Sequence, residues 1–211
     1  MKGKIRGLLT VGLLAGPMAA HAVTVSSYDI SFSQLSGFGG WSHTYSGTIT
    51  GNAYSGGSGT LNDGIIPTGE SNNHLFMLAD NSVITLYLSG PTLVTQLDLL
   101  GGVLPSNFIP GTLTGATITI GGNSEVLSSV AYGVGCLSGL CNDRFDLVGT
   151  GLELIATSTI QISNVTGGWD GFYNIGEVEV NGAPAVPEPA SLALLGLGLA
   201  GLGLSRRRKA A

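Results

Sequence analysis

The chain has 211 residues, including 35 glycines, and only 10% of the residues are charged and 7% aromatic. This composition argues against a helical bundle and favours β structure with many turns, in a chain long enough for one core. Arg144 and twelve carboxylates give residues 23–186 a net charge of −11. That charge excludes nucleic acid and anionic lipid headgroups as partners, and suits neutral, cationic or Ca²⁺-bridged ligands.

Residues 1–22 have the pattern of a secretory signal peptide. Three basic residues within the first six precede an apolar stretch at 8–18, and Ala20-His21-Ala22 forms an A-x-A cleavage site. The apolar stretch suits a peptidase better than a bilayer, although an uncleaved membrane anchor is the alternative. We therefore expect export through the Sec machinery and cleavage by signal peptidase before Val23.

Residues 23–182 are predicted to form one all-β domain, an antiparallel β-sandwich or jelly roll. Apolar and polar residues alternate in eight segments, at 23–32, 44–50, 83–88, 93–100, 116–120, 144–148, 158–165 and 175–180. Turn-forming clusters at 51–60, 67–73 and 121–125 separate several of these segments. No helical period of useful length occurs outside the two ends of the chain.

The domain contains no recognisable catalytic motif. A G-x-S-x-G elbow, an H-E-x-x-H helix and a P-loop are all absent from the sequence, so we expect no enzyme and name no catalytic residue. Arg144 is expected to pair with the neighbouring Asp143 or Asp146. Cys136 and Cys141 are expected to form a small disulfide after export, because a zinc site would need two more ligands.

Five short segments of the domain resemble the galactose-binding-like (discoidin, F5/8 type C) β-sandwiches. They are "LNDG" at 61–64, "VITLYL" at 83–88, "ATITIGG" at 116–122, "STIQISNV" at 158–165 and "IGEVEVNG" at 175–182. The resemblance implies that Asp63 and Glu177 help to hold a structural Ca²⁺ together with backbone carbonyls, which suits an ion that prefers hard oxygen ligands. The alternatives are a plain Asx turn at Asp63 and a solvent-facing strand residue at Glu177.

The same resemblance implies a ligand site in the loop before the last strand. This loop is "GGWDGFYN" at 167–174, and it contains Trp169, Asp170 and Tyr173. A flat aromatic ring can stack on the apolar face of a sugar while a carboxylate accepts hydrogen bonds from the hydroxyls. The alternative is that the tryptophan belongs to the core, which would leave a structural surface protein without a discrete ligand site.

The C-terminal segment divides into a linker at 183–189 and a hydrophobic helix with a basic tail at 190–211. The uncharged run at 192–204 has 13 residues, which as a helix rises about 20 Å against a hydrocarbon core of about 30 Å. The basic cluster Arg206, Arg207, Arg208 and Lys209 would keep the extreme C-terminus in the cytoplasm. The short run suggests a transient stop-transfer element, with an ordinary tail anchor as the alternative.

Three unlike elements occur in fixed order at this end: Pro187-Glu188-Pro189, the Leu/Gly-rich run and the four basic residues. This order resembles the PEP-CTERM sorting signal of exopolysaccharide-producing bacteria. The resemblance implies that a membrane-embedded exosortase recognises the motif, cleaves near it and delivers the body to the cell surface or extracellular matrix, where exopolysaccharide is an expected partner. The two prolines hold the segment extended, as a protease or transpeptidase needs.

Overall fold

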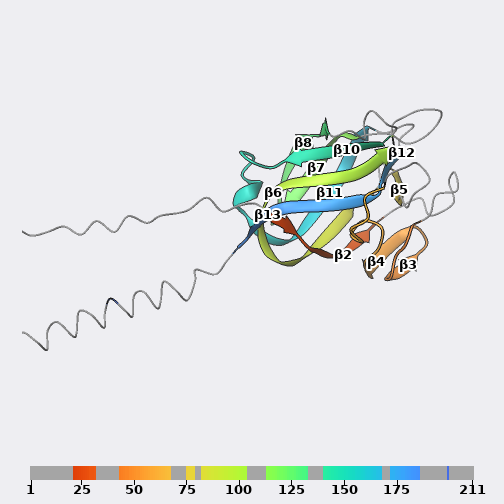
Figure 1. Cartoon of the computed structure of the whole chain (residues 1–211), viewed down its shortest axis with the longest axis horizontal. Helices are drawn as coiled ribbons and strands as arrows, with labels where there is room; N and C mark the ends of the chain where they lie inside the picture. The colour runs from red at the N-terminus through yellow and green to blue at the C-terminus, as the bar shows by residue number, and fades with distance from the viewer. Residues whose placement is uncertain are drawn as a thin grey trace, which may run out of the picture.

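Figure 1 shows the computed structural model of the chain, which describes residues 21–31, 43–67, 75–78, 82–103, 113–132, 140–167, 172–185 and Leu199. Most of the predicted signal peptide lies outside these ranges, as do Pro187, Glu188, Pro189 and the basic tail. Leu199 is the one described residue of the predicted C-terminal helix. Within the described part of the chain, no helix is long and apolar enough to cross a membrane.

The described residues form an antiparallel sheet of eleven strands and a separate pair of strands, which confirms the predicted all-β class. The strands are β1 (His21–Val23), β2 (Val25–Ile30), β3 (Thr48–Thr50), β4 (Ala53–Gly57), β5 (Leu75–Leu78), β6 (Ile84–Val103), β7 (Leu113–Ile120), β8 (Asn123–Ser128), β9 (Val130–Tyr132), β10 (Leu140–Asp146), β11 (Ala156–Gly167), β12 (Phe172–Ile175) and β13 (Glu177–Pro184).

Strand β6 joins the two layers of the sandwich. Its first part pairs with β2 and β11, and its second part pairs with β10 and β13. The change of partners occurs around Ser89-Gly90-Pro91, where a glycine and a proline allow the strand to bend. We predicted two strands here, at 83–88 and 93–100. That prediction is wrong, because the chain stays extended through the bend and pairs on both sides of it (Figure 1).

The core lies between the two layers and follows from the period-2 alternation of the sequence. In β7, Ala116, Ile118 and Ile120 are buried, whereas the threonines between them are partly exposed. Side chains from both parts of β6 and from β2, β10, β11 and β13 join the same hydrophobic cluster. Alternation therefore predicted which face of each central strand is buried.

Strands β4 and β8 were missed because their sequences are typical of turns. Strand β4 lies inside the glycine-rich segment 51–60, and β8 begins inside 121–125. In β4 the glycines allow close approach: a side chain at Gly57 would collide with the backbone of Gly47. The predicted strand at 44–50 shrinks to β3 and an isolated bridge between Tyr45 and Gly59.

The two ends of the sandwich are formed by different segments of the chain, and we name each end by these segments. Strand β13 runs from a pairing of Glu177 with Leu100 to a pairing of Pro184 with Thr92, a span of about 23 Å at ~3.3 Å per residue. We call the end formed by residues 21–24, 89–92 and 184–185 the exit pole, because the described chain enters and leaves there. The opposite end, formed by 61–65, 100–101, 113, 166–167 and 177, is the far pole.

Candidate functional site at the far pole

The structure brings Asp63 and Glu177 together at the far pole, although 113 residues lie between them. Glu177 is the first residue of β13 and is only 4% exposed. Its carboxylate accepts hydrogen bonds from the Gly64 N–H at 2.8 Å and the Val178 N–H at 3.2 Å. Asp63 lies in the exposed turn that supplies Gly64, and its Oδ1 accepts the Ile65 N–H at 2.9 Å. Glu177 is therefore not a solvent-facing strand residue.

The environment of Glu177 raises its pKa from 4.5 to about 7. Burial is the main cause, because it removes water from the charged form. The Gly64 and Val178 N–H groups lower the pKa, and the Asp63 carboxylate raises it, both by its charge and by a hydrogen bond. The site therefore holds two carboxyl groups close enough to repel when both are ionised.

This pair has the chemistry of a partial Ca²⁺ site. A hard cation would relieve the repulsion between Asp63 and Glu177. Within the described residues, no group of three His, Cys, Asp or Glu side chains is placed to hold a metal. The two residues fit Ca²⁺ if carbonyl oxygens and water complete the coordination.

Tyr173, which was expected to contact a ligand, belongs to the core. Its side chain is 0% exposed, and its hydroxyl lies 2.6 Å from the Ser82 Oγ, another buried atom. Burial raises its pKa far above the ordinary value, and the hydrogen bond from Ser82 only partly offsets this. The expectation that this ring is available to a sugar is thus corrected: residues 173–175 are all buried, so the strand that follows the loop is interior.

Trp169 and Asp170, the other two predicted ligand residues, lie outside the described residues. The residues on either side of them are placed: Gly167 pairs with Leu113 at the far pole, and β12 begins at Phe172. The segment that carries both residues therefore starts from the same end of the sandwich as Asp63 and Glu177.

Asp143 is a buried carboxylate that the sequence analysis did not single out as a site. It is 1% exposed, and its Oδ2 accepts the Leu113 N–H at 2.8 Å, while its Oδ1 has no hydrogen-bond partner among the described residues. Burial raises its pKa to about 6, against the opposing effect of hydrogen bonds from Leu113 and Ser129. The alternation of the 144–148 segment contained the signal: it places Phe145 inside, and extending it back by two residues places Asp143 inside as well.

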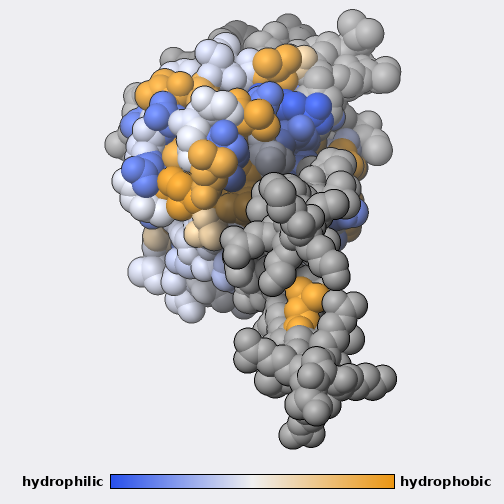
Figure 2. All heavy atoms as spheres, turned by 90° about the vertical axis from the view of Figure 1, so that its left-hand side faces the viewer, coloured by the Kyte–Doolittle hydropathy of each residue, from blue (hydrophilic) through white to orange (hydrophobic). Residues whose placement is uncertain are grey.

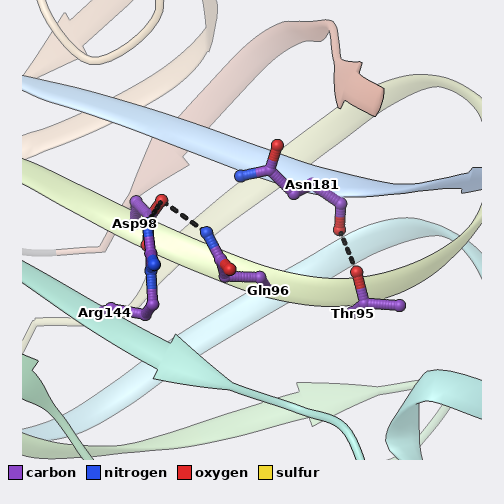
Figure 3. Close-up of polar contacts among 5 residues, drawn as sticks. All are labelled: Thr95, Gln96, Asp98, Arg144 and Asn181. Carbon is purple, nitrogen blue, oxygen red and sulfur yellow. Dashed lines mark hydrogen bonds and ion pairs between the residues drawn. The ribbon is translucent and has the colours of Figure 1, made fainter. Parts of the chain in front are cut away.

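We predicted that Arg144 would pair with its sequence neighbours Asp143 or Asp146. That prediction is wrong, because Arg144 pairs across strands with Asp98 (Figure 3). Its Nε and Nη2 lie 2.9 and 3.1 Å from the two carboxylate oxygens of Asp98, which is 2% exposed. Gln96 donates a further hydrogen bond to Asp98 at 2.7 Å. Asp143 faces the core and Asp146 accepts the Val148 N–H. The reason is the strand period, which puts Asp143 and Arg144 on opposite faces of β10.

The predicted disulfide stays a prediction. Cys136 lies outside the described residues, and Cys141 is placed only through the backbone of β10, where it pairs with Gly102.

Residues 185–209 match the model of the PEP-CTERM protein-sorting motif. The chain carries this sorting signal. The match contains every residue predicted for the signal, from Pro187 to Lys209, and it begins at the residue where the described fold ends. A signal of this kind marks an exported protein.

No curated protein matches the chain. Among solved structures, the family 32 CBM from C. perfringens NanJ in complex with galactose aligns over 77% of this chain and 99% of its own, with 14% identity and a TM-score of 0.45. A truncated AlyQ with CBM32 and alginate lyase domains aligns over 80% of this chain and 35% of its own (12% identity, TM-score 0.41). The family 89 glycoside hydrolase from Clostridium perfringens aligns over 71% and 15% (14% identity, TM-score 0.36).

Proposed function

We propose that this is an exported surface protein that an exosortase-type membrane enzyme processes at residues 185–209, and that its β-sandwich then contacts glycan of the cell surface or matrix. One observation carries the first part: the sorting motif begins at Ala185, the last residue that the fold holds. The described strands all lie before the motif, and the last of them, β13, ends at Pro184. The motif can therefore be cleaved off without removing any of the described strands.

The mass of the mature chain tests this processing. We expect the exported wild-type protein to begin at Val23 and to lack Arg206–Lys209, and we expect Glu188→Ala to accumulate with the basic tail still attached. The matched control is Glu179→Ala, which removes an exposed carboxylate from β13. A wild-type chain that keeps all four basic residues at the cell surface would show instead a simple tail anchor.

The glycan-binding part of the proposal places the contact at the far pole. Strands β1 and β13 lie side by side, so the two segments that lead to the membrane leave from the exit pole, and the far pole faces away from them. The loop with Trp169 and Asp170 starts from this free end. A tryptophan ring and a carboxylate supply stacking and hydrogen bonding for a neutral, polyhydroxylated ligand, which also suits an acidic body.

A glycan array tests this contact on the exported full-length protein. We expect binding to be lost in Trp169→Ala and reduced in Asp170→Asn, and to be kept in Tyr173→Phe, because that ring is in the core. If the wild type bound no glycan on the array, the result would favour a second candidate function, that of a structural surface protein acting as a spacer. The observation that favours this candidate is the burial of Tyr173, which removes one of the three predicted ligand residues.

We propose in addition that Asp63 and Glu177 hold a structural Ca²⁺. The supporting observation is the close pair of carboxyl groups, one of them buried, that neither an arginine nor a lysine neutralises within the described residues. Thermal unfolding with Ca²⁺ and with chelator tests this: an unchanged melting temperature would remove Ca²⁺ from the proposal and leave the glycan array unaffected.

A further inference from the structure

The exit pole is tied to the sorting motif by a very short length of chain. The Ala185 N–H donates to the Pro91 carbonyl at 2.9 Å, so the chain is held to the fold up to the first residue of the motif. Glu188 is three residues further on. At full extension it lies no more than about 11 Å from the Ala185 anchor, since each residue spans at most ~3.6 Å.

The hydrophobic run is almost as close. Leu192 follows Ala185 by seven residues, which reach at most about 25 Å. If the run at 192–204 is held by the membrane before processing, as proposed above, the exit pole lies within about 25 Å of it along the chain. A protein that binds this tripeptide, Pro187-Glu188-Pro189, is therefore expected to come within reach of the exit pole.

The surface of the exit pole is suited to such a contact. The segments that form it, at 21–24, 89–92 and 184–185, contain no Asp, Glu, Lys or Arg, although the body as a whole is acidic. A groove of about 390 Å³ lies beside Pro184 and is lined by Thr24, Ser89, Gly90 and Pro91. His21 and Ala22 also line it, and both leave with the predicted signal peptide.

Two exposed hydrophobic side chains lie at the same end of the sandwich as this groove. Val148 is 65% exposed and Leu154 is 77% exposed, and their segment lies at the same end, because Leu147 bonds to Thr95 and Ala156 pairs with Leu93. Figure 2 looks onto this end and shows hydrophobic residues beside weakly polar and strongly hydrophilic ones.

The two carboxylates beside Val148 and Leu154 in the sequence are engaged by backbone N–H groups of the same loop. Glu153 accepts hydrogen bonds from the Gly149 and Gly151 N–H groups at 2.9 and 2.7 Å, and Asp146 accepts the Val148 N–H at 3.0 Å. They therefore order the loop that presents Val148 and Leu154.

We propose that the exit pole is a docking surface for the membrane enzyme that processes the sorting motif, so that the enzyme reads the Gly90-Pro91 bend and Leu154 together with Pro187-Glu188-Pro189. This proposal rests on the processing proposed above. It predicts that processing depends on the folded body and on its distance from the motif, beyond the motif itself.

The experiment combines a surface charge with a longer connection. Gly90 accepts a side chain, since a Cβ there meets nothing within 4 Å, so Gly90→Glu adds a charge without disturbing the fold, and Gly90→Ser is its neutral control. Leu154→Glu is matched by Val126→Glu, which replaces another exposed hydrophobic residue, on β8. Each variant is made with and without ten Gly/Ser residues inserted between Ala185 and Val186, and the processed fraction is measured by intact mass in cells that contain the enzyme.

We expect Gly90→Glu and Leu154→Glu to slow processing about tenfold, equivalent to ~1.4 kcal/mol of transition-state binding, and both controls to match the wild type. The insertion should itself slow processing, and in its presence the two charges should have no further effect, because the body no longer has to meet the enzyme. Processing at wild-type rate in the charged and extended chains would overturn the proposal.

Two further outcomes identify other causes. If the charged variants are lost from the membrane fraction equally in cells without the enzyme, the exit pole contacts lipid and the docking proposal is wrong. If the unmodified chain is not processed and Glu188→Ala behaves in the same way, the processing itself is refuted. Melting temperatures of all variants within ~2 °C of the wild type would show that each one is folded.

Discussion

Replacing Glu177 by Gln probes the far pole most directly, because its expected effect changes sign with Ca²⁺. Glutamine keeps the shape of the side chain and can still accept the Gly64 or Val178 N–H, but it carries no charge beside Asp63. The folded-state pKa of Glu177 is about 7, against an ordinary value of 4.5. A carboxyl whose pKa is raised on folding binds more protons in the folded state, so its ionisation lowers stability as the pH rises from about 4.5 to 7.

The size of the effect follows from that pKa. At about 1.4 kcal/mol per pKa unit, ionised Glu177 costs on the order of 3 kcal/mol above pH 7 in the absence of metal. Glutamine offers one acceptor where the carboxylate offers two, and the lost hydrogen bond costs about 1 kcal/mol. Glu177→Gln should therefore stabilise the metal-free protein by about 2 kcal/mol at pH 8, which raises the melting temperature by roughly 4–8 °C for a domain of this size. At pH 4.5 the gain should disappear.

With Ca²⁺ the order should reverse. An ion at a hundred times its dissociation constant stabilises the folded state by about 2.7 kcal/mol, and the wild type should gain this, whereas Glu177→Gln loses a charged ligand and gains little. The assay is thermal unfolding at pH 4.5 and 8, with chelator and with Ca²⁺, beside the exposed control Glu179→Gln. A Gln variant less stable than the wild type in chelator at pH 8 would refute the electrostatic reasoning, and equal Ca²⁺ stabilisation of both chains would refute the metal site.

Three further substitutions test the interior. Asp143→Asn should raise the free energy of unfolding by about 2 kcal/mol at pH 7.5 and by little at pH 4.5. The reason is that burial raises the pKa of Asp143 to about 6, so its ionised form destabilises the fold. Urea unfolding at the two pH values measures this, and a pH-independent difference would contradict it. Arg144→Met should cost about 2 kcal/mol in the same assay, because Asp98 stays buried without its cationic partner; a variant as stable as the wild type would show that the ion pair contributes nothing. Tyr173→Phe should lower the free energy of unfolding by about 1–2 kcal/mol, because the buried Ser82 hydroxyl loses its partner. If a folded Phe variant lost all glycan binding, Tyr173 would have to contact the ligand.

The sequence predicted the central strands whose residues alternate. It missed β4 and β8, which contain turn-forming residues, and the short strands β5, β9 and β12. In β7 the alternation of Ala116, Ile118 and Ile120 locates the strand, and in β11 the pair Ile160 and Ile162 does so between two register shifts. Strand β4 is not visible in this way, because its glycines serve the close approach of Gly57 to Gly47, a contact between segments that only the fold brings together. The bend in β6 was taken as a strand end for a related reason: glycine and proline permit both a turn and a bent strand, and pairing decides between them.

The site shows the same division between local and long-range information. That Asp63 and Glu177 meet was expected from a family resemblance and not from spacing, because contacts across more than a hundred residues leave no local signal. Tyr173 was misplaced because the loop and the strand after it were treated as one unit. The chain enters β12 at Phe172, and from Tyr173 to Ile175 every residue is interior. A ring one residue inside a buried strand cannot belong to the surface of the preceding loop.

The pairing of β1 with β13 also constrains the order in which the two ends are processed. The expected signal-peptide cut, between Ala22 and Val23, falls inside β1, where these residues pair with Asn181 and Val180. A peptidase needs its substrate extended and unpaired, so this bond is accessible only before β1 docks. Because β13 lies near the C-terminal end of the chain, its strand emerges late in translocation, and the N-terminal cut has time to occur first. The sorting motif begins only after β13 has ended, at Ala185, so the body can be fully folded when the second enzyme arrives. The first cut is thus expected on an unfolded chain and the second on a folded one, and only the second enzyme can read a surface of the protein.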